Sequence, residues 1–150
     1  MQAGNEHAVK VLNGLIERTL DSVNGYREAA EHVDNPTYKS MFAERVDKRL
    51  ALTRQLQAEV RTFGAKPEDD QSFMGKAHNK FVGLKDAVTG SSDKGVINEV
   101  ERGEDVLKAQ FESAVGDSDL PPQVQNLVSR LYQEVKADHD QISRIKHELH

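Results

Sequence analysis

Apolar residues recur at alternating spacings of three and four along four long stretches of this sequence, and this periodicity constrains the fold more than any other feature. In the first stretch the repeating positions are Val9, Leu12, Ile16, Thr19, Val23, Tyr26, Ala30 and Val33. A stripe with this spacing is typical of an α-helix packed in a bundle. The sequence therefore predicts an all-α protein built from long helices, each with one buried face.

Composition favours a single domain over residues 1–150. Hydrophobic residues make up 37% of the chain and charged residues 30%, which is the balance of helices with one face in water. The net charge is −5 with both signs interspersed, so no basic stripe is available for a nucleic acid. The absence of cysteine excludes disulfides and thiolate chemistry. Neither a signal peptide nor an apolar run of about 20 residues is present, so we expect a cytoplasmic protein with no membrane or nucleic-acid partner.

Breaks in the apolar pattern divide the chain into five predicted helices. Long helices are expected over about residues 6–33, 35–63, 93–115 and 121–150, and a shorter one over about 72–88. Asn35-Pro36 has the residue types of a helix start, and Gly64 those of a helix end. The short helix lies where the chain has to return along the bundle. The predicted fold is a ferritin-like up-down four-helix bundle, with a short crossover helix between the second and third long helices.

Three ionisable residues occupy apolar positions near the middle of their helices. These are Arg49, Glu104 and Asp138, and the predicted antiparallel packing places them at about the same height. Because an unpaired buried charge costs several kcal/mol, we expect Arg49 to donate to both carboxylates. Tyr26 and His139 are expected to complete this structural polar layer. In the alternative interpretation the helix phase is shifted by one position and some of these side chains reach water.

A metal centre is the competing interpretation of the same height. Di-iron bundles take a glutamate from each of two helices and a Glu-x-x-His motif from each of the other two, and no such motif occurs here. Glu17 and Asp21 are expected on the outer side of the first helix, and a guanidinium cannot bind a cation. A partial site for iron or manganese from Glu101, Glu104 and His139 stays open as the alternative. His147 and His150 could hold a stray metal ion, but they lie in the last turn, where fraying is expected.

Several motifs resemble a bacterial family of ferritin-like bundles catalogued as a domain of unknown function. They are Leu12-Asn13-Gly14-Leu15-Ile16-Glu17, Asp21, Gly25-Tyr26, Ala29-Ala30, Arg49 with Leu56, Gly64 with Pro67, His78, Leu84-Lys85, Glu101-Arg102-Gly103-Glu104-Asp105 and His139-Asp140. The resemblance covers nearly the whole chain, and its most distinctive part is the Glu-x-Gly-Glu stretch. It implies a ferritin-like fold and a bacterial cytoplasm, and it implies no activity. Asn79 departs from the pattern, because an arginine is expected after His78.

The expected function is that of a non-enzymatic, metal-free bundle that acts by protein association in a stress-related context. No cofactor is expected. The last helix carries Leu127, Leu131 and Tyr132 on a broad face, which could support a homodimer. The alternatives are a ferritin-like iron-binding or redox protein, that is, a di-metal carboxylate oxidoreductase, and a protein that binds a small ligand between its helices.

Overall fold

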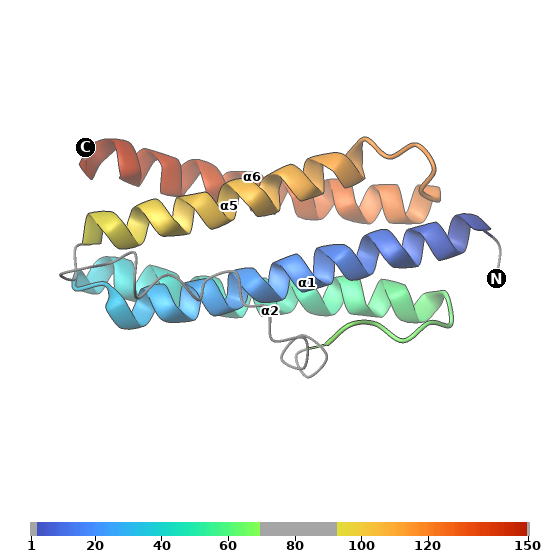
Figure 1. Cartoon of the computed structure of the whole chain (residues 1–150), viewed down its shortest axis with the longest axis horizontal. Coiled ribbons are helices and arrows are strands. Elements are labelled where there is room, and N and C mark those ends of the chain that lie inside the picture. Colours follow the sequence, from blue (N-terminus) through green and yellow to red (C-terminus); the bar gives the residue numbers. More distant parts are fainter. Residues whose placement is uncertain (1–2, 70–92, 150) are drawn as a thin grey trace.

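A computed structural model describes residues 3–69 and 93–149, which form four long α-helices (Figure 1). Helix α1 spans Ala3–His32, α2 spans Pro36–Thr62, α5 spans Asp93–Val115 and α6 spans Pro122–Leu149. These bounds lie within a few residues of those predicted from the apolar periodicity, and they confirm the four long helices. The short helix predicted over residues 72–88 lies outside the described residues.

The turn between α1 and α2 is stabilised by Asn35 and Pro36, the residues that predict a helix start in the sequence. The Asn35 side chain accepts hydrogen bonds from the backbone N–H groups of Thr37 (2.8 Å) and Tyr38 (3.3 Å), and Pro36 follows as the first helical residue. Side-chain caps of this kind satisfy N–H groups that have no partner within the helix. At the other end of α2, Gly64 adopts a φ of 74°, a left-handed conformation that a glycine adopts without steric cost.

The start of α5 is fastened to the same end of the bundle. The Asp93 carboxylate accepts hydrogen bonds from the backbone N–H groups of Asp34 (2.7 Å) and Asn35 (3.0 Å). One side chain therefore joins the turn between α1 and α2 to the first residue of α5. Helix α2 ends at the opposite end of the bundle from the start of α5 (Figure 1). This placement of the two helix ends is the one that the predicted crossover connection requires, as in ferritin-like bundles.

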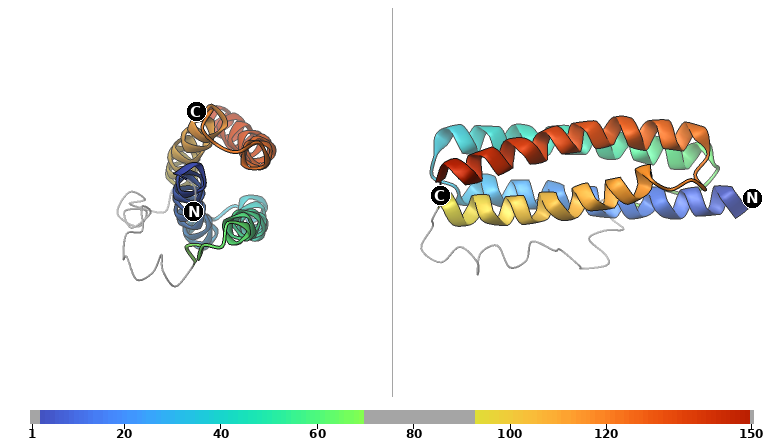
Figure 2. Two further views of the ribbon diagram at one scale, coloured as in Figure 1. Left: turned by 90° about the vertical axis from the view of Figure 1, so that its right-hand side faces the viewer. Right: turned by 90° about the horizontal axis from the view of Figure 1, so that it is seen from above.

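The four helices occupy the corners of a quadrilateral in the end-on view (Figure 2). Helix α1 packs against both α2 and α5, and α5 packs against α6. Hydrogen bonds between side chains bridge α2 and α6, including Arg130 to Gln55 (2.9 Å) and Gln123 to Glu59 (2.9 Å). Helices α2 and α5 therefore stand at diagonal corners, so a side chain that joins them passes through the centre of the bundle.

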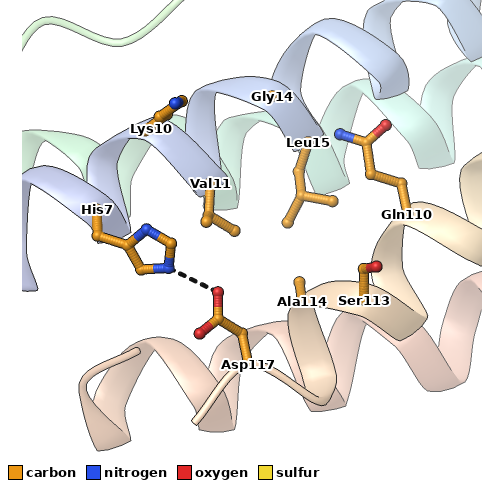
Figure 3. A pocket seen from close by; sticks show the side chains of 9 residues that line it. All are labelled: His7, Lys10, Val11, Gly14, Leu15, Gln110, Ser113, Ala114 and Asp117. Atoms are coloured by element: carbon orange, nitrogen blue, oxygen red, sulfur yellow. Dashed lines mark hydrogen bonds and ion pairs between the residues drawn. The ribbon is translucent and has the colours of Figure 1, made fainter. Parts of the chain in front are cut away.

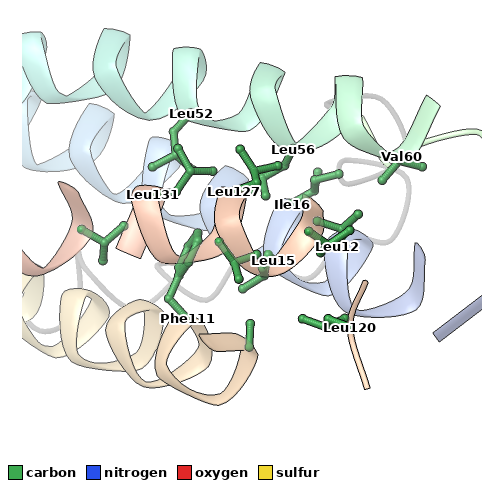
Figure 4. Packing of buried hydrophobic residues seen from close by; sticks show 14 of the residues in the cluster. Leu12, Leu15, Ile16, Leu52, Leu56, Val60, Phe111, Leu120, Leu127 and Leu131 are labelled. Carbon is green, nitrogen blue, oxygen red and sulfur yellow. The ribbon is translucent and has the colours of Figure 1, made fainter. Parts of the chain in front are cut away.

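The apolar core consists of two separate clusters, one toward each end of the bundle. The larger cluster includes Leu12, Leu15, Leu56, Phe111 and Leu131, several of which interdigitate in Figure 4. The smaller one includes Tyr26, Phe42, Ile97 and Ile142. On every helix, the buried residues that lie between the two clusters in sequence include polar ones: Asp21 and Ser22 on α1, Arg45 and Arg49 on α2, Glu104 on α5 and Asp138 on α6. The polar layer therefore divides the core at mid-height.

The face of α6 that the sequence suggests for dimerisation, with Leu127, Leu131 and Tyr132, lies against the rest of the bundle. Leu127 and Leu131 are buried within the larger cluster, and Tyr132 packs against it while donating to Glu112 (3.1 Å). Leu127 and Leu131 are therefore not available as a homodimer surface, because they pack within the protomer itself, whereas Tyr132 is only partly buried. Among the described residues, no helix is both long and apolar enough to cross a membrane.

Candidate functional site

The centre of the polar layer is the ion pair between Arg49 of α2 and Glu104 of α5. Nη1 of Arg49 lies 2.7 Å from Oε1 of Glu104, and Nη2 lies 2.8 Å from Oε2. The two parallel hydrogen bonds use the fork geometry in which a guanidinium binds a carboxylate most strongly. Arg49 is 0% exposed and Glu104 is 2% exposed. The pair therefore lies on the bundle diagonal and out of contact with water.

Two further contacts complete the Arg49 site. Nη1 also donates to the hydroxyl of Ser22 (2.7 Å), and Nη2 also donates to Oδ2 of Asp138 (3.2 Å). Arg49 thus joins side chains from the other three helices. Among the described residues, its Nε is buried without a hydrogen-bond partner. As the sequence predicts, Arg49 donates to both carboxylates.

Charge interactions decide the protonation state of this guanidinium. Burial alone would lower the pKa of Arg49, but the negative charge of Glu104 acts in the opposite direction and raises it above its usual value. An arginine in this setting stays protonated at any pH at which the protein is folded. The layer therefore contains a permanent positive charge that belongs to the chain.

Asp138 of α6 is the second anion of the layer and has three cationic neighbours on α2. Besides Arg49, the Nε of Arg45 lies 3.6 Å from Oδ2 of Asp138, and the Nζ of Lys48 lies 3.2 Å from Oδ1. Arg45 is buried like Arg49, whereas the Lys48 side chain is 47% exposed. Asp138 therefore contacts a half-exposed lysine on the solvent side and two buried arginines on the inner side.

Arg45 also links the layer to the smaller apolar cluster. Its Nη1 donates to the hydroxyl of Tyr26 (3.1 Å), and its Nη2 donates to Oε1 of Gln141 (2.5 Å). The guanidinium carbons of Arg45 and Arg49 lie 5.4 and 5.5 Å from the centre of the Tyr26 ring, within the range of cation–π attraction. Burial, followed by the charge of Glu104, raises the pKa of Tyr26 well above its usual value. Tyr26 is therefore a neutral member of the layer.

Sequence reasoning missed Arg45 and misplaced Asp21. Val46 lies four residues after Phe42 and so continues the apolar spacing, but it is only half-buried, whereas the charged Arg45 beside it is buried. The spacing of four between Arg45 and Arg49 was the available signal, because residues four apart share a helix face. Asp21 was expected on the outer side of α1, but it is 4% exposed and lies 3.9 Å from Arg18. That expectation is wrong because the buried face of α1, which contacts both α2 and α5, is broader than a single stripe.

His139 lies outside the network around Arg49. Its Nε2 is 2.6 Å from the Asp105 carboxylate and its Nδ1 is 3.1 Å from that of Asp140. Burial opposes the charged form of the ring, but the hydrogen bonds to Asp140 and Asp105 outweigh it and raise the pKa of His139. Among the described residues, no hydrogen bond joins His139 to Arg49, Glu104 or Asp138. The structure thus places this histidine between Asp105 of α5 and Asp140 of α6 and not in the polar layer.

The alternative metal site of Glu101, Glu104 and His139 is not assembled. Glu101 accepts a hydrogen bond from the Nζ of Lys146 (2.7 Å), while Glu104 binds Arg49 and His139 binds the two aspartates. Burial acts to raise the pKa of Glu101, but the hydrogen bond and charge of Lys146 hold it below its usual value. Each of the three residues is engaged by a different partner, and they do not converge as metal ligands among the described residues.

The comparisons with known proteins agree with this architecture. Residues 7–117 match the family described as "Domain of unknown function (DUF2383)". No curated protein matches the chain. Among solved structures, a point mutant of Dps1 from Mycobacterium smegmatis superposes with a TM-score of 0.81 at 10% sequence identity, covering 97% of this chain and 99% of the other. At this identity the likeness concerns the fold alone, which is a ferritin-like four-helix bundle.

Proposed function

Since this chain belongs to the family described as "Domain of unknown function (DUF2383)", whose description states no activity, we propose its function from the chemistry of the bundle itself. We propose a bundle without enzymatic activity, metal-free at its centre, that acts by associating with another protein molecule. The single observation that carries the proposal is the bidentate pair between Arg49 and Glu104 at 2.7 and 2.8 Å.

This pair supports a centre that does not bind metal. A cation at mid-height would need the carboxylate of Glu104, and both of its oxygens already accept hydrogen bonds from Arg49. Displacing the guanidinium from Glu104 would break a fully buried bidentate ion pair, which costs several kcal/mol. Arg49 therefore takes the electrostatic place that a metal ion takes in carboxylate bundles.

The same contacts argue against acid–base catalysis at the centre. A general acid or base works best with a pKa near the operating pH. Lys146 holds the pKa of Glu101 below its usual value, and both carboxylate oxygens of Glu104 already accept hydrogen bonds from Arg49. These carboxylates have the surroundings of structural ion pairs.

Association with a second copy of the chain is the form of the proposal that can be tested directly. Among the described residues, the large hydrophobic side chains that are exposed and not merely half-buried are Val106 and Val115, each at 38%. An interface on this surface would be largely polar, because charged residues of both signs are interspersed along a chain that has 20 basic and 25 acidic residues, a few of them buried. Complementary charges across an interface lose strength as ionic strength rises.

Elemental analysis of the untagged protein tests the metal-free centre. The metal content of the wild-type protein is compared with that of Glu104→Gln. Glu99→Gln, at a half-buried position of the same helix where the carboxylate binds Arg102, serves as the matched control. We expect the Glu104 substitution to leave the metal content unchanged. Stoichiometric iron or manganese that disappears in Glu104→Gln and persists in Glu99→Gln would overturn the proposal.

Light scattering coupled to size exclusion tests association. We expect a dimer at low ionic strength that dissociates as salt is added. If the protein is a monomer at every protein and salt concentration, it does not act by association with a second copy.

A further inference from the structure

A second constellation lies at the end of the bundle remote from Asp93, between the first turns of α1 and the loop that joins α5 to α6. The Nε2 of His7 on α1 lies 2.7 Å from Oδ2 of Asp117 in the loop. The carboxylate of Asp119 converges on the same point, and one ligand atom from each of the three residues lies within 4.8 Å of the other two. Figure 3 shows His7 reaching from α1 toward Asp117 at one end of a cavity.

The cavity beside this cluster has a volume of about 470 Å³. Val11, Leu15 and Ala114 contribute apolar side chains to its lining, and Gln110 and Ser113 contribute polar ones (Figure 3). It is large enough to hold several water molecules. His7 and Asp117 line the cavity and their side chains are 39% and 21% exposed. An ion can therefore reach them from solvent, and water can occupy coordination positions on the cavity side.

We propose that His7, Asp117 and Asp119 form a binding site for a divalent first-row transition metal ion, with His7 Nε2 and one oxygen from each aspartate as ligands. An imidazole with two carboxylates is a mixed donor set of the kind used for zinc, iron and manganese. The two carboxylates offset the charge of a divalent ion. Three protein ligands leave further positions for water from the cavity, so this would be an open site.

The existing contact between His7 and Asp117 needs little change to hold an ion. Bonds of about 2.0–2.1 Å to nitrogen and oxygen place two neighbouring ligand atoms about 3 Å apart. The ring nitrogen and the carboxylate oxygen are 2.7 Å apart as a hydrogen-bonded pair, so a small movement admits the ion in place of the proton. The other oxygen of Asp117 accepts a hydrogen bond from the backbone N–H of Asp119 (2.9 Å), which fixes the orientation of a ligating carboxylate.

The contact between His7 and Asp117 is also that of an ordinary surface ion pair. A substitution at Asp119 distinguishes a metal site from such an ion pair. An ion pair needs only the first two residues, whereas a metal site needs the third as well. Asp119 is exposed, so replacing its carboxylate removes a ligand without disturbing the core. The site is remote from the Arg49 layer, which makes this inference independent of the proposed function.

Calorimetric titration of Zn²⁺ into the untagged, chelator-treated full chain tests the site. We expect one equivalent to bind to the wild-type protein, and affinity to fall at least about tenfold in His7→Gln and in Asp119→Asn. His147→Gln removes a histidine at the C-terminal end and serves as the control that should retain binding. Glu104→Gln should also retain it, which keeps this site distinct from the centre of the bundle.

Co²⁺ supplies a second readout that reports coordination directly. Its visible absorption bands should appear on binding to the wild-type protein and weaken in Asp119→Asn, whose fold circular dichroism verifies. Absence of binding in the wild-type protein would overturn the site. Zn²⁺ affinity that is unchanged in Asp119→Asn, or lost equally in His147→Gln, would overturn it as well.

Discussion

Arg49 and Glu104 meet through two parallel hydrogen bonds of 2.7 and 2.8 Å, from helices at diagonal corners of the bundle. Neither helix could make this contact by its backbone packing, so two long side chains span the centre. Water is excluded from both charged groups. Removing one partner of such a pair leaves a buried charge unpaired and is strongly destabilising. Replacing both partners with apolar residues costs far less.

Loss of Arg49 should be strongly destabilising. Arg49→Met leaves the carboxylate of Glu104 buried without its counter-ion, and we expect the free energy of unfolding to fall by about 3–5 kcal/mol. Lys48→Met is the matched control, because Lys48 and Arg49 both lie 3.2 Å from Asp138 while only the lysine is half in water. The control should cost less than about 1 kcal/mol. Chemical denaturation measures both, and equal losses would show that Arg49 is solvated.

Replacing Arg49 and Glu104 together should lower the free energy of unfolding by less than the sum of the two single substitutions. In Arg49→Met with Glu104→Leu, no buried charge of the central pair is left unpaired, and Asp138 keeps Arg45 and Lys48 as neighbours. We expect the two substitutions to be non-additive by about 0.5–3 kcal/mol, which a double-mutant cycle measures. Strict additivity would mean that the two side chains are energetically independent.

Substitution by alanine should change the stability in opposite directions at Gly14 and Gly64. A methyl group on Gly14 would lie 3.3 Å from the Nε2 of Gln110, the far end of a flexible side chain, so Gly14→Ala should stabilise α1 by about 0.5–1 kcal/mol. Gly64 has open space around it but a φ of +74°, so Gly64→Ala should destabilise by about 1 kcal/mol. Thermal melts of the two variants test this, and a lower melting temperature for Gly14→Ala would show that Gln110 cannot move aside.

His139 should contribute stability only when it is protonated. Its pKa in the folded protein is raised by the hydrogen bonds to Asp140 and Asp105, against burial. The contribution is therefore fully present below the ordinary histidine pKa of about 6.5 and disappears as pH rises through the higher folded value.

The variant His139→Gln tests this pH dependence. We expect it to be less stable than the wild-type protein by up to about 1 kcal/mol in mildly acidic solution, and the difference should shrink at alkaline pH. His147→Gln is the control, because the hydrogen bond of His147 within the described part of the chain goes to the Ser143 carbonyl of its own helix. A difference that grows with pH would contradict the assignment.

Much of the fold could be predicted because it is encoded locally. The apolar spacing identified the four helices, and Asn35, Pro36 and Gly64 marked their ends through backbone chemistry that needs no other part of the chain. The height of Arg49, Glu104 and Asp138 followed from helix length and from the direction of each helix. These properties depend on 1.5 Å of rise per residue and on hydrophobic periodicity, both of which a single sequence carries.

The partners within the layer were decided by tertiary structure. Arg45 and Asp21 are buried because their helices present broad faces to two neighbours, and the rotation that sets this width depends on all four helices together. The same rotation turns His139 toward Asp105, away from Glu104, and brings His7 to Asp117 across 110 residues of sequence. Periodicity places a charge on a face and at a height, but only the packing of the complete bundle determines which opposite charge it meets.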